Sequence, residues 1–278
     1  MSLKPVGPIC QTKDWYDYGP DGILERRPAI TPATLGLTPP AAAGTSPPKA
    51  VARGECSYLN PVPLGTVTVP KAVCDRLRGE SGAAQISAAK PKASQTWVDG
   101  SRSAAVEVQI TIDGQQILVT LPTDADMKGK NLPTVQQLAE ALRAVPKDQR
   151  AFSKKVFLSP VPSQQSTPQR TVGGDAGSGE ITLYPVPDRQ EQNDFDNRVM
   201  HESGHNYQEQ LWSGGAQAVA AWQAAARSDD RRPSPYAAQN AGEDFCEFNI
   251  LYNAAHGTKC EEVAKKIYPN RWAKRESY

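Results

Sequence analysis

Apolar and polar residues alternate most regularly over residues 104–112 and again over residues 115–121. Successive side chains of a strand point to opposite faces, so each run predicts a strand with one buried face. Asp113 and Gly114 separate the runs, and Asp-Gly is a favoured two-residue turn of β-hairpins. The sequence therefore predicts a hairpin over residues 104–121.

Two shorter apolar runs, at residues 154–159 and 179–184, predict further strands. Residues 79–100 and the stretch from 160 to 178 are small, polar or proline-rich, which predicts loops. We interpret residues 156–184 as part of a sheet whose edge strand is unassigned. An extended peptide could add to such an edge as a further strand, and an ordinary core hairpin is the alternative.

Other segments place apolar residues at helical spacing. Thr134 is a favourable N-cap for one of them, and Asp188 or Asn193 could cap the longest, which runs to about residue 212. The predicted helices cover residues 70–78, 134–145, about 193–212, 216–227, 242–255 and 261–267. Strands followed by helices predict an α+β fold, with a small mixed sheet packed on the longest helix and a helical C-terminal part.

The N-terminal region differs in composition. Residues 1–60 are proline-rich, so we expect an irregular arm or linker, with a targeting or docking segment as the alternative. Residues 61–150 are interpreted as a small α/β region, either separate from or continuous with residues 151–278, which contain the candidate chemistry.

Charge and hydropathy exclude some functions. The 278 residues include 31 basic and 30 acidic residues, so no nucleic-acid partner is indicated. No apolar run approaches the roughly 20 residues of a membrane span. The first residues contain no apolar segment typical of a signal peptide, so export would need another route or a longer chain.

The five cysteines form no CxxC pair, so we do not expect cysteine ligands to a metal. The sequence leaves open bridges among Cys10, Cys56 and Cys74, a bridge between Cys246 and Cys260, or buried reduced thiols.

The strongest chemical signal is the sequence His-Glu-Ser-Gly-His at residues 201–205. His201 and His205 lie one helical turn apart, so both imidazoles can bind one metal ion, and Glu202 lies beside it. This is the H-E-x-x-H arrangement of zinc metallopeptidases, in which the glutamate is the general base. A chance pair of helical histidines is the alternative.

A catalytic zinc commonly has a third protein ligand. Glu243 and Glu247 are four residues apart and share one helix face, whereas Asp244 points elsewhere. His256, beside Gly257 at a helix end, is better suited to a capping or surface role. Spacing alone does not choose between Glu243 and Glu247.

A second motif resembles the anthrax lethal factor-like zinc peptidases, a glutamate-zincin family of bacterial toxins. The resemblance covers about residues 150–268, and the sequence departs from the family pattern at 246 and at 248–249. The form His-Glu-x-Gly-His also fits this family. The matching residues of the second motif are Tyr236, Asn240, Glu243, Phe245 and Glu247.

This resemblance implies a zincin-like catalytic domain with one Zn²⁺ per chain. Glu243 would be the third zinc ligand beside the two histidines. Tyr236 would donate a hydrogen bond to the oxyanion, and Glu202 would be the general base. Glu247 and Asn240 would support the ligands, with Glu247 orienting a histidine.

The resemblance further implies a zinc-dependent endopeptidase, a bacterial secreted effector or toxin. It would bind a protein or peptide substrate as an added strand, and it could have a secretion-system or immunity partner. Specialised secretion into a target cell is the expected location, and the cytoplasm is the alternative. An intracellular or cell-wall peptidase or amidase is a second hypothesis, and a non-catalytic binding module on a zincin fold is a third.

Overall fold

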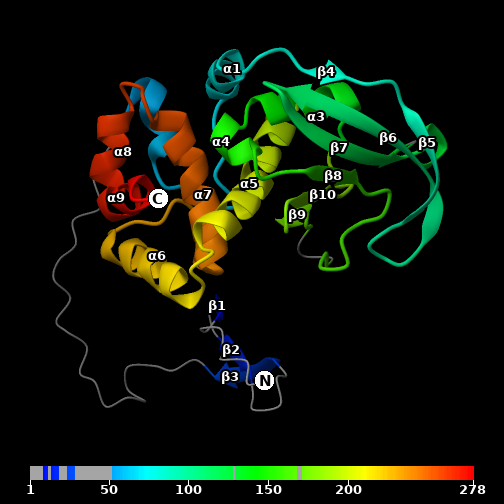
Figure 1. The fold of residues 1–278 in the computed structure, drawn as a ribbon. Coiled ribbons are helices and arrows are strands. Elements are labelled where there is room, and N and C mark those ends of the chain that lie inside the picture. The colour runs from blue at the N-terminus through cyan, green and yellow to red at the C-terminus, as the bar shows by residue number, and fades with distance from the viewer. Residues whose placement is uncertain (1–8, 12–13, 19–23, 29–51, 128, 168–170) are drawn as a thin grey trace, which may run out of the picture.

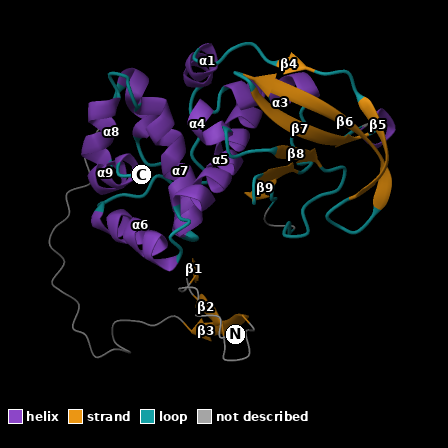
Figure 2. Ribbon diagram, in the orientation of Figure 1, coloured by secondary structure: helices purple, strands orange, loops and turns teal. Residues whose placement is uncertain are grey.

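The computed structural model describes residues 9–11, 14–18, 24–28, 52–127, 129–167 and 171–278. The fold is α+β: a mixed sheet lies on one side and a group of helices on the other, with the long helix α5 between them (Figure 1, Figure 2). The predicted fold class is confirmed at this level.

The main sheet has seven strands in the order β4-β6-β7-β8-β10-β9, with β5 also paired to β6. The pairs β7–β8 and β8–β10 are parallel and the others are antiparallel. The strands are β4 (Gln85–Ile86), β5 (Lys90–Thr96), β6 (Arg102–Ile112), β7 (Gln115–Pro122), β8 (Lys155–Leu158), β9 (Gly174–Gly177) and β10 (Glu180–Leu183). The hairpin β6–β7 turns at Asp113 and Gly114, both with positive φ, as the sequence predicts.

Helix α5 (Gln192–Leu211) is the centre of the molecule, because it contacts α3, α4 and β9 on one side and α7 on the other. Glu191 and Asp194 form a capping box at its start, so the predicted caps Asp188 and Asn193 are wrong. Thr134 caps α3 as predicted. The other helices are η2 (Gly54–Leu59), α1 (Lys71–Gly79), α2 (Asp124–Met127), α3 (Val135–Arg143), α4 (Lys147–Arg150), α6 (Ala216–Ser228), η3 (Tyr236–Ala238), α7 (Ala241–Ala255), α8 (Glu261–Ile267) and α9 (Pro269–Glu276).

Two predicted loops contain strands. Strand β5 is largely polar and exposed, so its sequence shows no alternation of apolar and polar residues. It is a strand because its backbone pairs with that of β6. Strand β9 has the sequence Gly-Asp-Ala-Gly, and it forms because Ser178 and Gly179, with φ of 55° and 80°, turn the chain back onto β10.

The N-terminal region also departs from the prediction. Strands β1 (Ile9–Gln11), β2 (Asp14–Tyr18) and β3 (Leu24–Pro28) form a three-stranded antiparallel sheet, so residues 1–60 are not irregular throughout. Within the region 1–60 that we interpreted as an arm or linker, residues 29–51 lie outside the described residues.

One hydrophobic cluster joins the sheet to the helices, and it includes Ile110 and Leu138 as well as Val199 and Phe248. Residues from the two regions divided at 150 therefore share a core. None of the described helices is long and apolar enough to cross a membrane.

A disulfide joins Cys56 in η2 to Cys260 at the start of α8, across 204 residues of sequence. The possible bridges that the sequence left open, among Cys10, Cys56 and Cys74 or between Cys246 and Cys260, do not form. Such a long-range pair has no signal in the sequence, because only packing brings the two ends together. Cys74 and Cys246 are free and buried.

Candidate metal centre

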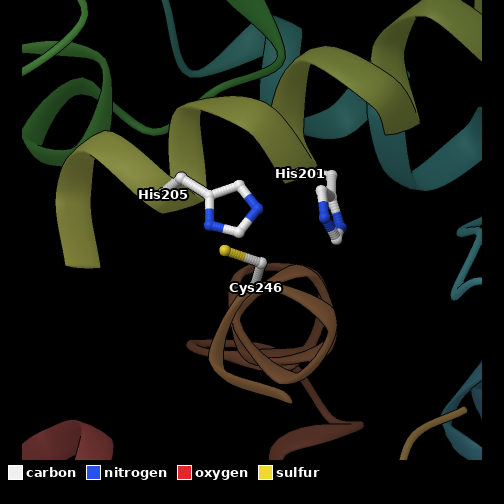
Figure 3. A group of neighbouring side chains, drawn as sticks. All are labelled: His201, His205 and Cys246. Atoms are coloured by element: carbon white, nitrogen blue, oxygen red, sulfur yellow. The ribbon is translucent and has the colours of Figure 1, made fainter. Parts of the chain in front are cut away.

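The two motif histidines lie on the face of α5 that is turned towards α7. His201 and His205 project from consecutive turns, with ring centroids 5.1 Å apart, and Cys246 projects from α7 towards them (Figure 3). Gly204 allows the two helices to approach closely, because a Cβ at this position would lie 3.2 Å from the Cys246 sulfur. The glycine of the motif therefore has a packing role.

The structure distinguishes between the two candidate glutamates. Glu243 Oε2 lies 3.0 Å from His201 Nε2 and 3.4 Å from His205 Nε2. Asn240 caps α7 by accepting a hydrogen bond from the Glu243 N–H at 3.0 Å, which fixes the first turn, where Glu243 lies. Glu243 thus directly contacts both imidazoles.

Glu247, one turn further along α7, contacts the opposite edge of an imidazole. Its Oε1 lies 3.0 Å from His201 Nδ1. Its Oε2 accepts hydrogen bonds from the Val67 N–H at 2.5 Å and from the Ser234 hydroxyl at 2.6 Å. This fully buried carboxylate therefore holds the His201 ring with Nε2 turned towards Glu243. Val67 and Ser234 were not predicted, since neither belongs to a motif.

The charges of this group stabilise one another. Burial lowers the pKa of His201, but the carboxylates of Glu243 and Glu247 outweigh this and raise it to about 10. Burial raises the pKa of Glu243, yet His201 and His205 hold it far below its usual range. In the metal-free protein, a proton on His201 therefore balances the carboxylates.

Glu202 lies in the same cleft and is 6% exposed. Burial raises its pKa, while His201 and His205 oppose the rise. Gly174 in β9 packs directly on it, because a Cβ at Gly174 would lie 2.6 Å from Glu202 Oε1. Only a glycine lets this edge strand approach so closely, and a carboxylate with a raised pKa is suited to accept a proton.

Tyr236, in the short helix η3, belongs to the same site. Its ring centroid lies 5.7 Å from that of His201, and its hydroxyl donates a long hydrogen bond of 3.4 Å to Glu243 Oε1. The hydroxyl therefore lies next to the candidate ligands.

Cys246 is a further possible donor, although the sequence, which has no CxxC pair, led us to expect no cysteine ligand. One ligand atom each from His201, His205 and Cys246 lie within 4.8 Å of one another. Burial, together with nearby carboxylates, raises the pKa of this thiol well above its usual value, so it is protonated in the metal-free protein. Glu243 is the better third donor, since it is already ionised and its Oε2 lies 3.0 and 3.4 Å from the Nε2 atoms of the two histidines.

The spacing of these donors fits a tetrahedral metal ion. Two donor atoms about 2.0–2.1 Å from such an ion lie about 3.3 Å from each other. The separations of Glu243 Oε2 from the two Nε2 atoms, 3.0 and 3.4 Å, match this value. Glu243 Oε2 therefore lies at ligand spacing from each histidine, while the three donor atoms that all lie within 4.8 Å of one another come from His201, His205 and Cys246.

Other predicted or possible sites do not join this group. Asp244 accepts hydrogen bonds from Trp222 and Arg271 on the other side of α7, as its position in the helix predicts. His256 is an exposed helix-end residue that stacks on Tyr252 and lies 3.4 Å from Glu261. Its expected surface role is confirmed.

A cavity of about 500 Å³ opens beside His201 and Glu202, and one wall is formed by the start of β9. Among the strands that the structure describes, β9 is the edge of the sheet, and no further strand pairs with it on its outer side. The Tyr184 N–H donates to the Gly173 carbonyl at 2.9 Å, and backbone groups of an antiparallel pair alternate in direction. The N–H and C=O groups of Gly174 and Ala176 therefore point to the free edge, next to Glu202.

We compared the chain with protein-family models, with curated proteins and with solved structures, and none of the three comparisons gave a match. The functional argument therefore depends on the geometry of the site and on the motifs of the sequence.

Proposed function

We propose that the protein is a zinc-dependent endopeptidase that hydrolyses peptide bonds in proteins or peptides. The observation that carries this proposal is the position of Glu243 Oε2, 3.0 and 3.4 Å from the Nε2 atoms of His201 and His205. Glu202 lies beside these residues in a cleft that ends at a free sheet edge. A general base next to a three-donor metal site is the arrangement required for metal-assisted hydrolysis.

The roles of the side chains follow from this arrangement. A zinc ion held by His201, His205 and Glu243 would act as a Lewis acid and lower the pKa of a bound water from 15.7 to about 7. Glu202 accepts a proton from the attacking water and returns it to the leaving amine. The Tyr236 hydroxyl donates a hydrogen bond to the carbonyl oxygen as negative charge develops on it.

The substrate would bind as an additional strand along β9. The outward N–H and C=O groups of Gly174 and Ala176 can pair with an extended peptide. Because Gly174 packs against Glu202, such a peptide passes directly in front of the general base.

The proposal is tested with the zinc-loaded protein, a proteome-derived peptide library and mass spectrometry. We expect wild type to cleave peptides, Glu202→Gln to lose almost all activity, and Tyr236→Phe to lose about 10²-fold, each with unchanged zinc content. Glu262→Gln, which changes an exposed glutamate of α8, is the matched control. Full activity of Glu202→Gln, or no cleavage by wild type at full zinc occupancy, would refute the proposal.

Cys246 supports a second candidate, a closed and non-catalytic metal site. Two histidines, a carboxylate and a thiolate would complete a tetrahedron and leave no position for water, as in structural zinc sites. Cys246→Ala separates the candidates, because a closed site would lose zinc affinity. A peptidase with Glu243 as its third ligand keeps both zinc and activity in this variant.

The proposed biological role is that of a secreted bacterial effector or toxin. The resemblance of the two motifs to lethal factor-like peptidases supports a secreted bacterial effector or toxin. The Cys56–Cys260 disulfide adds support, since such bonds persist in oxidising compartments outside the cytoplasm. Parallel digestion of host-cell proteins and of peptidoglycan fragments distinguishes this role from that of a cell-wall peptidase or amidase.

A further inference from the structure

Arg198 lies on α5 at the cleft. It precedes His201 by three residues and Glu202 by four, so all three share one helix face and line the same cavity. The sequence motifs give this arginine no role.

The guanidinium is held in place on several sides. Its Nη2 donates a hydrogen bond to Gln190 Oε1 at 2.5 Å, and its Cζ lies 5.8 Å from the centre of the Phe195 ring. Gly173 packs against it, because a Cβ at Gly173 would lie 3.0 Å from Cζ and from Nε. These contacts fix the guanidinium before a substrate arrives.

One end of this fixed group has no partner. Nη1 is buried and forms no hydrogen bond with any described residue. Asp194 and Glu202 are its acidic neighbours, yet within the described residues neither accepts a hydrogen bond from Nη1. A buried donor of a charged group is destabilising when left unsatisfied, so an acceptor supplied by a ligand would be strongly favoured.

We propose that Arg198 is a specificity residue that binds a carboxylate of the peptide next to the scissile bond. This inference rests on the proposed peptidase function. A carboxylate fits better than a neutral acceptor, because it can take two parallel hydrogen bonds from a guanidinium and also balance its charge. The carboxylate comes either from an aspartate or glutamate side chain or from the C-terminus of the substrate.

The test uses pairs of peptides that differ only by Glu against Gln at each position flanking a cleaved bond, and by a free or amidated C-terminus. For wild type, we expect kcat/KM to be about 10–100-fold higher for the acidic member of one peptide pair. This is the difference in rate that one charge-assisted hydrogen bond typically produces. The pair that shows the difference identifies the source of the carboxylate. Arg198→Gln brings the ratio to about one, and Arg198→Lys keeps part of it.

Arg189→Gln is the matched control, because Arg189 is exposed, lies in the preceding loop and does not line the cavity. It should keep the wild-type ratio. Thermal unfolding and zinc content of each variant show whether it is folded and loaded.

A binding measurement separates this inference from the peptidase proposal. Fluorescence anisotropy with the Glu202→Gln protein reports the affinities of the same labelled peptides without turnover. If the Glu202→Gln protein binds the acidic peptide more tightly and the double variant Glu202→Gln/Arg198→Gln does not, the inference is supported. This holds even if wild type cleaves nothing. Equal affinities and equal kcat/KM for acidic and neutral peptides in wild type would overturn it, whatever the catalytic outcome.

Discussion

The metal-free protein should lose stability as the pH rises from 6.5 to about 10, because of a single histidine. In the folded state the pKa of His201 is about 10, against an ordinary value of 6.5. Between these values the folded protein holds a proton that the unfolded chain has released. The stabilisation is fully present below pH 6.5 and is lost as the pH rises through the folded-state pKa.

The size of the effect follows from the same two values. The difference corresponds to roughly 5 kcal/mol in total, or about 1.4 kcal/mol for each pH unit in this range. Glu243 does not contribute there, because its lowered pKa affects stability only below about its usual value of 4.5. A decrease of about 1.4 kcal/mol per pH unit is readily measured.

The assay is urea unfolding in the presence of a chelator at pH 7, 8 and 9. We expect the free energy of unfolding of wild type to decrease with pH relative to that of His201→Gln, which cannot titrate. His256→Gln is the control, since His256 is an exposed histidine at a helix end and should keep the wild-type slope. Saturating zinc should remove the decrease, because binding requires the unprotonated imidazole.

Equal pH slopes in metal-free wild type and His201→Gln would refute the reasoning. The carboxylates of Glu243 and Glu247 would then not hold a proton on His201, and the arrangement described for these three side chains would be wrong.

Two further predictions concern elements that the motifs do not contain. Gly174→Ala would force the Glu202 side chain away, because the new Cβ would lie 2.6 Å from its Oε1. We expect kcat to decrease by about 10²-fold with little change in melting temperature, whereas Gly177→Ala on the same strand should remain active, and equal activity of both variants would contradict this. Cys56→Ser opens a loop of 204 residues and should lower the free energy of unfolding by up to about 5 kcal/mol. Urea unfolding of wild type with and without dithiothreitol checks this, and an unchanged midpoint under reduction would show that the bond contributes nothing.

Much of the fold was predictable from local patterns. The alternation around Asp113-Gly114 specified the β6–β7 hairpin, and Thr134 marked the start of α3. The spacing of four residues between His201 and His205 predicted that both imidazoles lie on one helix face, as they do. These features depend on residues close together in the sequence, where spacing fixes the direction of side chains.

Other strands were not predictable. Strand β5 has no apolar alternation, and β9 is short and contains two glycines, so both form through pairing with a neighbouring strand. The disulfide between Cys56 and Cys260 likewise depends on the contact between η2 and α8. Pairing across long sequence separations is decided by the packing of the whole chain, which no local pattern contains.

The sequence by itself determined that two imidazoles lie on one face of a helix, with the carboxylate of Glu202 beside them. Only the tertiary structure decided that Glu243 contacts both histidines while Glu247 supports His201, since the spacing of the two glutamates permitted either role. It also placed Gly174 against Glu202 and turned Arg198 into the cleft. The physical reason is that helical spacing in the sequence determines on which face of α5 a side chain lies. The packing of α5 against α7 and β9 determines which residues that side chain contacts.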